Sequence, residues 1–111
     1  FHVNWFRKSA DGKFLWPGYG ENMRVLEWIV KRCNGQVAAC DTQVGASPAF
    51  ADFNTDGLQG FTEEEFNQVM ALDSSEWQAE IAGQEEFFAS LGDHLPAELL
   101  RQRELLAARM A

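Results

Sequence analysis

Residues 1–22 carry the sequence FHVNWFRKSADGKFLWPGYGEN, and this stretch decides how the rest of the chain is interpreted. It contains six of the chain's fourteen aromatic residues. Glycines flank Tyr19 on both sides and Pro17 lies two residues before it, so the backbone can bend sharply there. A turn that lifts an aromatic ring beside other rings can cover both faces of a flat ligand, and stacking contributes about 1–3 kcal/mol per base.

A second interpretation of the same stretch stays open, because aromatic side chains most often fill hydrophobic cores. Glu21 and Asn22, directly after the glycines, favour binding. The amide of Asn22 carries both a hydrogen-bond donor and an acceptor. Such an amide can pair with the edge of a purine, as asparagine does when it reads a base in DNA.

Three segments, FHVNWFRK, GKFLWPGYGENMRVLEWI and RCNG, closely resemble the last part of GTP-dependent phosphoenolpyruvate carboxykinases. The likeness is nearly continuous from Phe1 to Gly35. Further on, TQVGASPA is similar to the family's TPIGxxP segment, and DSSEWQAEIAGQEEFFASLGDHLPAEL to its acidic C-terminal helices. The resemblance implies that the intact enzyme is a gluconeogenic lyase, a decarboxylase that converts oxaloacetate and GTP to phosphoenolpyruvate, GDP and CO2 with manganese or magnesium.

The resemblance also implies a guanine pocket. Phe6 and Tyr19 would cover the two faces of the guanine ring, with Phe14 at an edge. Asn22 would hydrogen-bond the base, helped by the neighbouring backbone, and Trp16 would pack nearby. Tyr19 stands where phenylalanine is usual in the family. The residues assigned to nucleotide binding are Trp5, Phe6, Phe14, Tyr19, Gly20, Glu21 and Asn22.

The parts that perform phosphoryl transfer are not found in the sequence. There is no GxxxxGK[ST] phosphate loop and no cluster of Lys, His and Asp that could hold a metal. We therefore predict no catalytic and no metal-binding residue here, since the family has these upstream. The chain begins with Phe1 inside an apolar segment, so we expect a part of a longer protein, inactive alone, whose partner is the remainder of the carboxykinase chain.

The formal charge of −8 is unevenly distributed. Up to Arg32 there are six basic and three acidic residues, whereas acidic residues dominate after it. A basic front suits an anionic ligand, and the strong overall negative charge argues against a nucleic-acid partner. No signal peptide, membrane span or zinc spacing is present, so Cys33 and Cys40 are expected to be free thiols. We expect a cytoplasmic protein without a membrane partner, and a monomeric intact enzyme.

The fold class expected is α+β and mostly helical, forming the C-terminal segment of the carboxykinase nucleotide-binding domain over residues 1–111. An N-terminal hairpin would pair strands at Phe1–Phe6 and Lys13–Trp16, before the pocket loop that ends at residue 22. A helix is predicted over 21–34, and irregular structure with short strands over 36–60. The apolar face of the helix over 21–34 would hold Met23, Leu26, Ile29, Val30 and Cys33.

Further helices are predicted over 62–110, which makes about four in all. Thr62 with Glu65, and Asp73 with Glu76, have the spacing of helix-starting capping boxes. Gly92 would end the second of these helices. Its apolar stripe would hold Trp77, Ile81, Phe88 and Leu91, and the last helix, opened by Leu95 and Pro96, would bury Leu99, Leu106 and Met110.

An alternative function is calcium binding at residues 52–63, because DFNTDGLQGFTE satisfies the calcium-loop pattern. Asp52, Asn54, Asp56 and Glu63 would supply oxygens. The context differs from an EF-hand, since no helix leads into the loop and no second loop exists. A third alternative is an aromatic platform for sugars or single strands, which would bind without regard to base identity.

Overall fold

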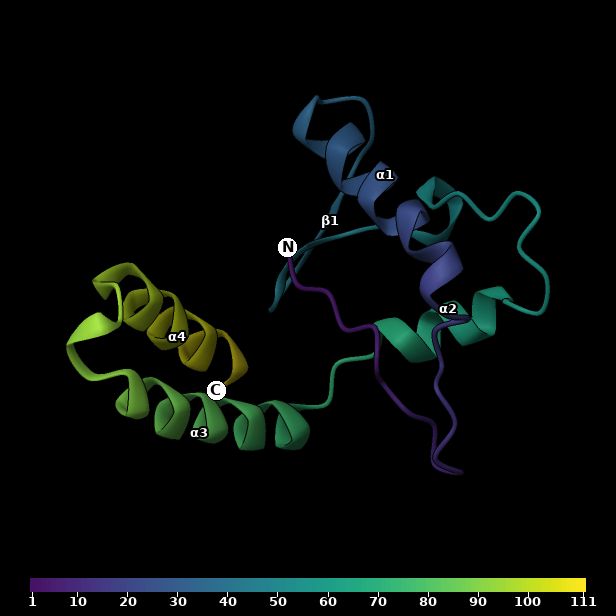
Figure 1. The fold of residues 1–111 in the computed structure, drawn as a ribbon. Coiled ribbons are helices and arrows are strands. Elements are labelled where there is room, and N and C mark those ends of the chain that lie inside the picture. The colour runs from purple at the N-terminus through teal and green to yellow at the C-terminus, as the bar shows by residue number, and fades with distance from the viewer. The chain divides into compact units, whose positions relative to one another are not determined.

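The computed structural model describes all of residues 1–111, which divide into two compact units, Phe1–Ala71 and Leu72–Ala111. Together the units contain four α-helices and one pair of antiparallel strands (Figure 1). The expectation of a mostly helical α+β chain with about four helices is confirmed. None of these helices combines the length and the apolar character needed to cross a bilayer.

The N-terminal strands expected at Phe1–Phe6 and Lys13–Trp16 are not formed. A single antiparallel bridge between Lys8 and Phe14 is all that remains of that hairpin. Strands persist only where a neighbour accepts and donates their backbone hydrogen bonds. The two segments separate after one bridge, so the ladder cannot propagate.

The first unit places a 3-10 turn, η1 (Tyr19–Glu21), directly before helix α1 (Asn22–Cys33). Lys31 and Arg32 occupy the last turn of α1, where positive charge suits the helix dipole. The helix ends at Cys33, and Asn34 caps it with an N–H that bonds to the carbonyl of Val30 at 3.0 Å.

Helix α1 turns only part of the expected face to the core, because Ile29 packs inward as expected but Met23, Leu26 and Val30 do not. Trp28 is buried, whereas Met23 is 70% exposed and Val30 is 58% exposed. The helix has apolar residues on two sides, and the helical period alone does not predict which side packs against the core. The large Trp28 indole has the most area to bury, and it orients the helix so that Val25 and Ile29 also pack inward.

The remaining elements of the first unit are short. Strand β1 (Cys40–Thr42) pairs with β2 (Gly45–Ser47), and Cys40 lies opposite Ser47. A 3-10 turn, η2 (Phe50–Asp52), follows, and the unit continues to helix α2 (Glu63–Met70). The backbone N–H of Thr62 donates to Glu65 at 2.7 Å, and that of Glu65 donates to Thr62 Oγ1 at 3.3 Å. The predicted capping box is therefore present.

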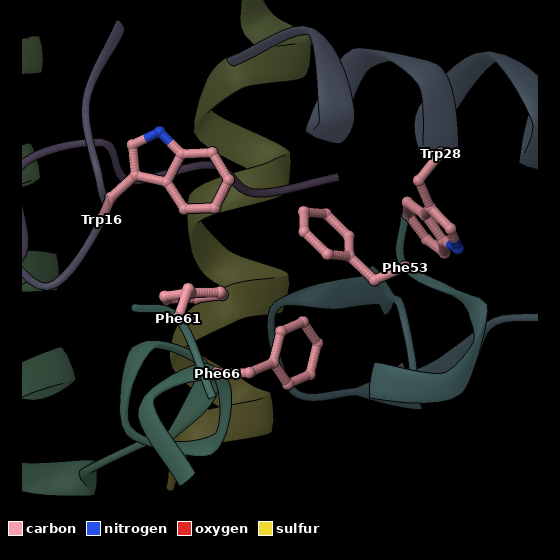
Figure 2. Close-up of a cluster of buried hydrophobic side chains, with 5 residues drawn as sticks. All are labelled: Trp16, Trp28, Phe53, Phe61 and Phe66. Carbon is pink, nitrogen blue, oxygen red and sulfur yellow. The ribbon is translucent and has the colours of Figure 1, made fainter. Parts of the chain in front are cut away.

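An aromatic cluster forms the core of this unit. Figure 2 shows its five buried side chains, Trp16, Trp28, Phe53, Phe61 and Phe66. Trp16 meets Phe61 edge to face at a centroid distance of 5.6 Å, and Phe53 meets Phe66 at 5.6 Å. Three of the five come from loops rather than helices, so packing of these rings positions the loops as well as α1 and α2.

The second unit is a pair of helices, α3 (Ser74–Leu91) and α4 (Ala97–Met110), joined by the turn η3 (Gly92–His94) (Figure 1). Asp73 caps α3 by accepting from two backbone N–H groups, and Gly92 ends the helix at φ 52°. Arg103 of α4 donates to the carbonyl of Ile81 at 3.2 Å and binds Glu85 at 2.7 Å. These contacts hold the two helices together.

Burial in the second unit agrees only in part with the expected stripes. Ile81 and Met110 are buried, as predicted. Leu99, expected on the buried side of α4, is 45% exposed. It lies in the first turn of α4, and burial along this helix is concentrated further toward its C-terminal end.

Candidate functional site

A tight loop between residues 7 and 15 brings two rings of the expected pocket together. The backbone N–H of Leu15 donates to the carbonyl of Arg7 at 2.9 Å, and that of Ser9 donates to Lys13 at 2.8 Å. These bonds place Phe6 and Phe14 with ring centroids 6.2 Å apart and planes 64° apart. The rings are 71% and 59% exposed, so they form a surface rather than part of the core.

A positive charge lies against this pair of rings. Lys8 Nζ is 5.3 Å from the centroid of the Phe14 ring, within the range of a cation–π contact. On the turn below it, Ser9 donates to the carboxylate of Asp11, and this hydrogen bond holds the pKa of Asp11 below its usual range. The loop thus presents aromatic area beside a cation, a combination suited to a flat anionic ligand.

The Pro17 to Gly20 segment forms the turn that the sequence predicts. Gly18 has φ 127°, a conformation that residues with a Cβ rarely adopt, and its carbonyl accepts from the N–H of Glu21 at 3.0 Å. The ring of Tyr19 is 91% exposed on this turn. The clasp of one ligand between Phe6 and Tyr19 stays a prediction.

The side chain of Asn22 is held by a buried tryptophan. Trp16 Nε1 donates to Asn22 Oδ1 at 2.7 Å. The backbone N–H of Asn22 bonds to the carbonyl of Tyr19, which fixes the residue at the junction of η1 and α1. Because the carbonyl oxygen of the amide faces Trp16, the Nδ2 group is the part left to meet a ligand.

Trp16 is itself fixed by the core. Its ring contacts Trp5, Phe53 and Phe61 at centroid distances of 5.9, 6.1 and 5.6 Å. The indole nitrogen lies on the side of the ring turned away from Phe61 (Figure 2). Sequence reasoning assigned Trp16 only a packing role, and the spacing of six residues to Asn22 gave no local motif that would reveal the hydrogen bond.

Glu21 and Arg24 belong to a polar network that links α1 to Asn54. Arg24 pairs with Glu21 at 2.6 Å and donates to the backbone carbonyl of Asn54 at 3.0 Å. The side-chain amide of Asn54 donates to Glu27, which also pairs with Lys31 at 2.6 Å. Lys31 first, and Asn54 second, hold the pKa of Glu27 below its usual range. Glu21 is therefore engaged with Arg24, and its assignment to nucleotide binding remains a prediction.

Asn54 of this network belongs to the 52–63 loop, and its hydrogen bonds connect that loop to α1. Asn54 uses its amide nitrogen on Glu27 and its oxygen on the N–H of Asp56, at 3.0 Å each. No group of three or more His, Cys, Asp or Glu side chains is gathered anywhere in the chain where it could hold a metal ion. Asn54 therefore ties the loop to α1 through Glu27.

The structure thus brings the candidate residues into two groups. Phe6, just before the 7–15 loop, and Phe14, within it, form one, and Trp5 and Asn22 meet Trp16 in the other. Tyr19, Gly20 and Glu21 make up η1, immediately before Asn22.

Comparison with known proteins places the whole chain in one family. Residues 1–109 match the profile of the phosphoenolpyruvate carboxykinase C-terminal P-loop domain. This chain is 47% identical over 110 residues to a protein of Anaeromyxobacter dehalogenans named phosphoenolpyruvate carboxykinase [GTP]. It is 40% identical over 112 residues to a protein of the same name from Ascaris suum. Each alignment covers 99% of this chain, and the chain spans less than a fifth of those relatives, 18% and 17% of their lengths. The resemblance seen in the sequence is confirmed, and the chain belongs to the GTP-dependent phosphoenolpyruvate carboxykinase family.

Proposed function

We propose that this chain supplies the guanine-recognition surface of a carboxykinase that converts oxaloacetate and GTP to phosphoenolpyruvate, GDP and CO2 in gluconeogenesis. The observation that carries the proposal is the side chain of Asn22, held at 2.7 Å by a buried indole next to a turn that exposes Tyr19. A rigid amide beside exposed rings suits a base that is stacked and hydrogen-bonded at one edge.

The exposed rings support the same role. Phe6, Phe14 and Tyr19 are each more than half exposed, although burial of a phenylalanine side chain from water stabilises a protein by about 1.5–3 kcal/mol. Exposed rings offer this stabilisation to a ligand that stacks on them. A planar base that stacked on them would recover part of it on binding.

Manganese or magnesium, which the family implies for the reaction, does not fit the residues of this chain, because no cluster of ligating side chains is present. The role proposed for these residues is to bind and orient the base.

The remainder of the carboxykinase is the partner we propose for the exposed side of α1. Met23, Leu26 and Val30 follow one another at helical spacing on α1 and are 43–70% exposed. Contiguous apolar surface of this kind marks an interaction site. In the native intact enzyme, peroxide should oxidise Met23 more slowly than in the urea-unfolded enzyme, and equal rates would contradict this contact.

The substitution Asn22→Ala in the intact enzyme tests the guanine-binding role. Loss of the hydrogen bond to the base should weaken GTP binding about tenfold, the equivalent of 1.4 kcal/mol. Because adenine lacks the carbonyl at position 6, ATP binding should change little, and the preference for GTP should fall. Equilibrium titration with both nucleotides measures this, and an unchanged GTP affinity would refute the proposal.

A further inference from the structure

The orientation of the Asn22 amide follows from the chemistry of its partner. An indole N–H can only donate a hydrogen bond, so the atom 2.7 Å from Trp16 Nε1 must be the amide oxygen and not the nitrogen. Rotating the amide by half a turn would set two donors against each other. The hydrogen bond from Trp16 therefore stabilises one of the two flipped orientations of the Asn22 amide, which have nearly the same shape.

Trp16 cannot easily move to release the amide. Its side chain is only 7% exposed and meets Phe53 and Phe61 edge to face, with interplanar angles of 76° and 81°. The backbone of Asn22 is likewise held, through its N–H bond to Tyr19. Both partners of the hydrogen bond are thus positioned by the fold before any ligand arrives.

We propose that Trp16 is a positioning residue that makes Asn22 a hydrogen-bond donor toward the base, and so sets the preference for 6-oxopurine over 6-aminopurine nucleotides. This inference rests on the guanine-binding role proposed above. A 6-oxopurine presents a carbonyl acceptor to Nδ2, whereas a 6-aminopurine presents a second donor. Without the indole N–H, the amide can turn and offer its oxygen to the amino group.

The experiment replaces the indole N–H without changing the shape of the ring. In the intact enzyme, Trp16 is replaced by 3-benzothienylalanine, in which sulfur stands in place of the N–H group. The same replacement at Trp28 is the matched control, because Trp28 is 3% exposed in the same cluster and its indole nitrogen has no hydrogen-bond partner. Trp16→Phe and Asn22→Ala complete the set.

The readout is the ratio of the dissociation constant for ATP to that for GTP, with ITP as a second 6-oxopurine. Replacement at Trp16 should lower the ratio about tenfold, with GTP and ITP weakened together and ATP strengthened. Replacement at Trp28 should leave the ratio unchanged. In the Asn22→Ala background, replacing Trp16 should have no further effect on the ratio, because the amide that it orients is gone.

Two results would overturn the inference while leaving the guanine-binding role intact. One is a ratio that falls in Asn22→Ala but stays within twofold of wild type when Trp16 loses its N–H group. The other is an equal fall when Trp28 is replaced, which would show that core packing and not orientation matters. An unchanged ratio in Asn22→Ala would refute the guanine-binding role itself, and the inference with it.

Discussion

The guanidinium of Arg7 donates to the backbone carbonyl of Val69 at 3.1 Å, and it also donates to the carbonyl of Ala71. These carbonyls belong to the C-terminal end of α2 and the residue that follows it, where a helix leaves acceptors unpaired and favours positive charge. Arg7 lies next to Phe6 and begins the loop that carries Phe14, so this contact anchors the loop to a helix 62 residues away in the sequence.

Removing this anchor should loosen the loop. We expect Arg7→Met to weaken GTP binding by the intact enzyme severalfold and to destabilise the first unit by about 1–2 kcal/mol, since charged hydrogen bonds to helix ends are lost. Nucleotide titration and denaturant unfolding measure the two effects. Lys13→Met is the control, because its side chain lies on the same loop and is 83% exposed. Equal effects of the two substitutions would show that charge and not anchoring is responsible.

Exposed and buried rings should respond to truncation in opposite ways. Phe14→Ala should leave unfolding nearly unchanged and weaken GTP binding about five- to 150-fold, as expected for about 1–3 kcal/mol of base stacking. Phe61→Ala should instead destabilise the chain by about 3–5 kcal/mol, because Phe61 is 7% exposed within the aromatic cluster. A Phe14→Ala variant that unfolds as readily as Phe61→Ala would contradict the distinction between surface and core.

The two glycines around Tyr19 offer a matched pair. Gly18 has φ 127°, whereas Gly20 does not have a positive φ, and a Cβ at either position would meet no atom within 4 Å beyond its chain neighbours. Gly18→Ala should therefore cost about 1–2 kcal/mol through backbone strain alone and shift the turn before Asn22. Gly20→Ala should be tolerated. The measurements are the melting temperature and the GTP affinity, and the prediction is wrong if the two variants behave alike.

The ion pair and the hydrogen bond of Glu27 predict a pH dependence. Its pKa is lowered from the ordinary value of 4.5 by Lys31 first and Asn54 second. A carboxylate with a lowered pKa adds stability above its unfolded-state pKa, and loses that contribution as the pH falls through the lower, folded-state value. We expect Glu27→Gln to reduce the acid sensitivity of unfolding below about pH 4.5. Glu80→Gln, on an exposed position of α3, is the control, and identical acid profiles for wild type and Glu27→Gln would refute the prediction.

Features that depend on neighbouring residues could be predicted from the sequence. The caps of α2 and α3 follow from Thr62 and Asp73, because a cap needs only a side chain and the next three backbone groups. The end of α3 at Gly92 follows in the same way.

Features that depend on distant partners could not be predicted in this way. The strand expected at Phe1–Phe6 lacks a continuous pairing partner, and the covered side of α1 is set by the fit of Trp28 into the cluster. At the candidate site, the turn around Tyr19 is encoded by its glycines and Pro17. The hydrogen bond between Trp16 and Asn22 depends on how a loop and a helix meet, and no local spacing records that meeting.

The position of Trp16 has an evolutionary consequence. One indole packs in the aromatic cluster and also donates a hydrogen bond to the Asn22 amide, so under the proposed role a mutation at residue 16 would change folding and recognition together. Substitutions at residue 16 would therefore be constrained both by folding and by ligand recognition. Under the same role, exchange of the partly buried Asn22 side chain would alter nucleotide preference and leave the aromatic cluster in place.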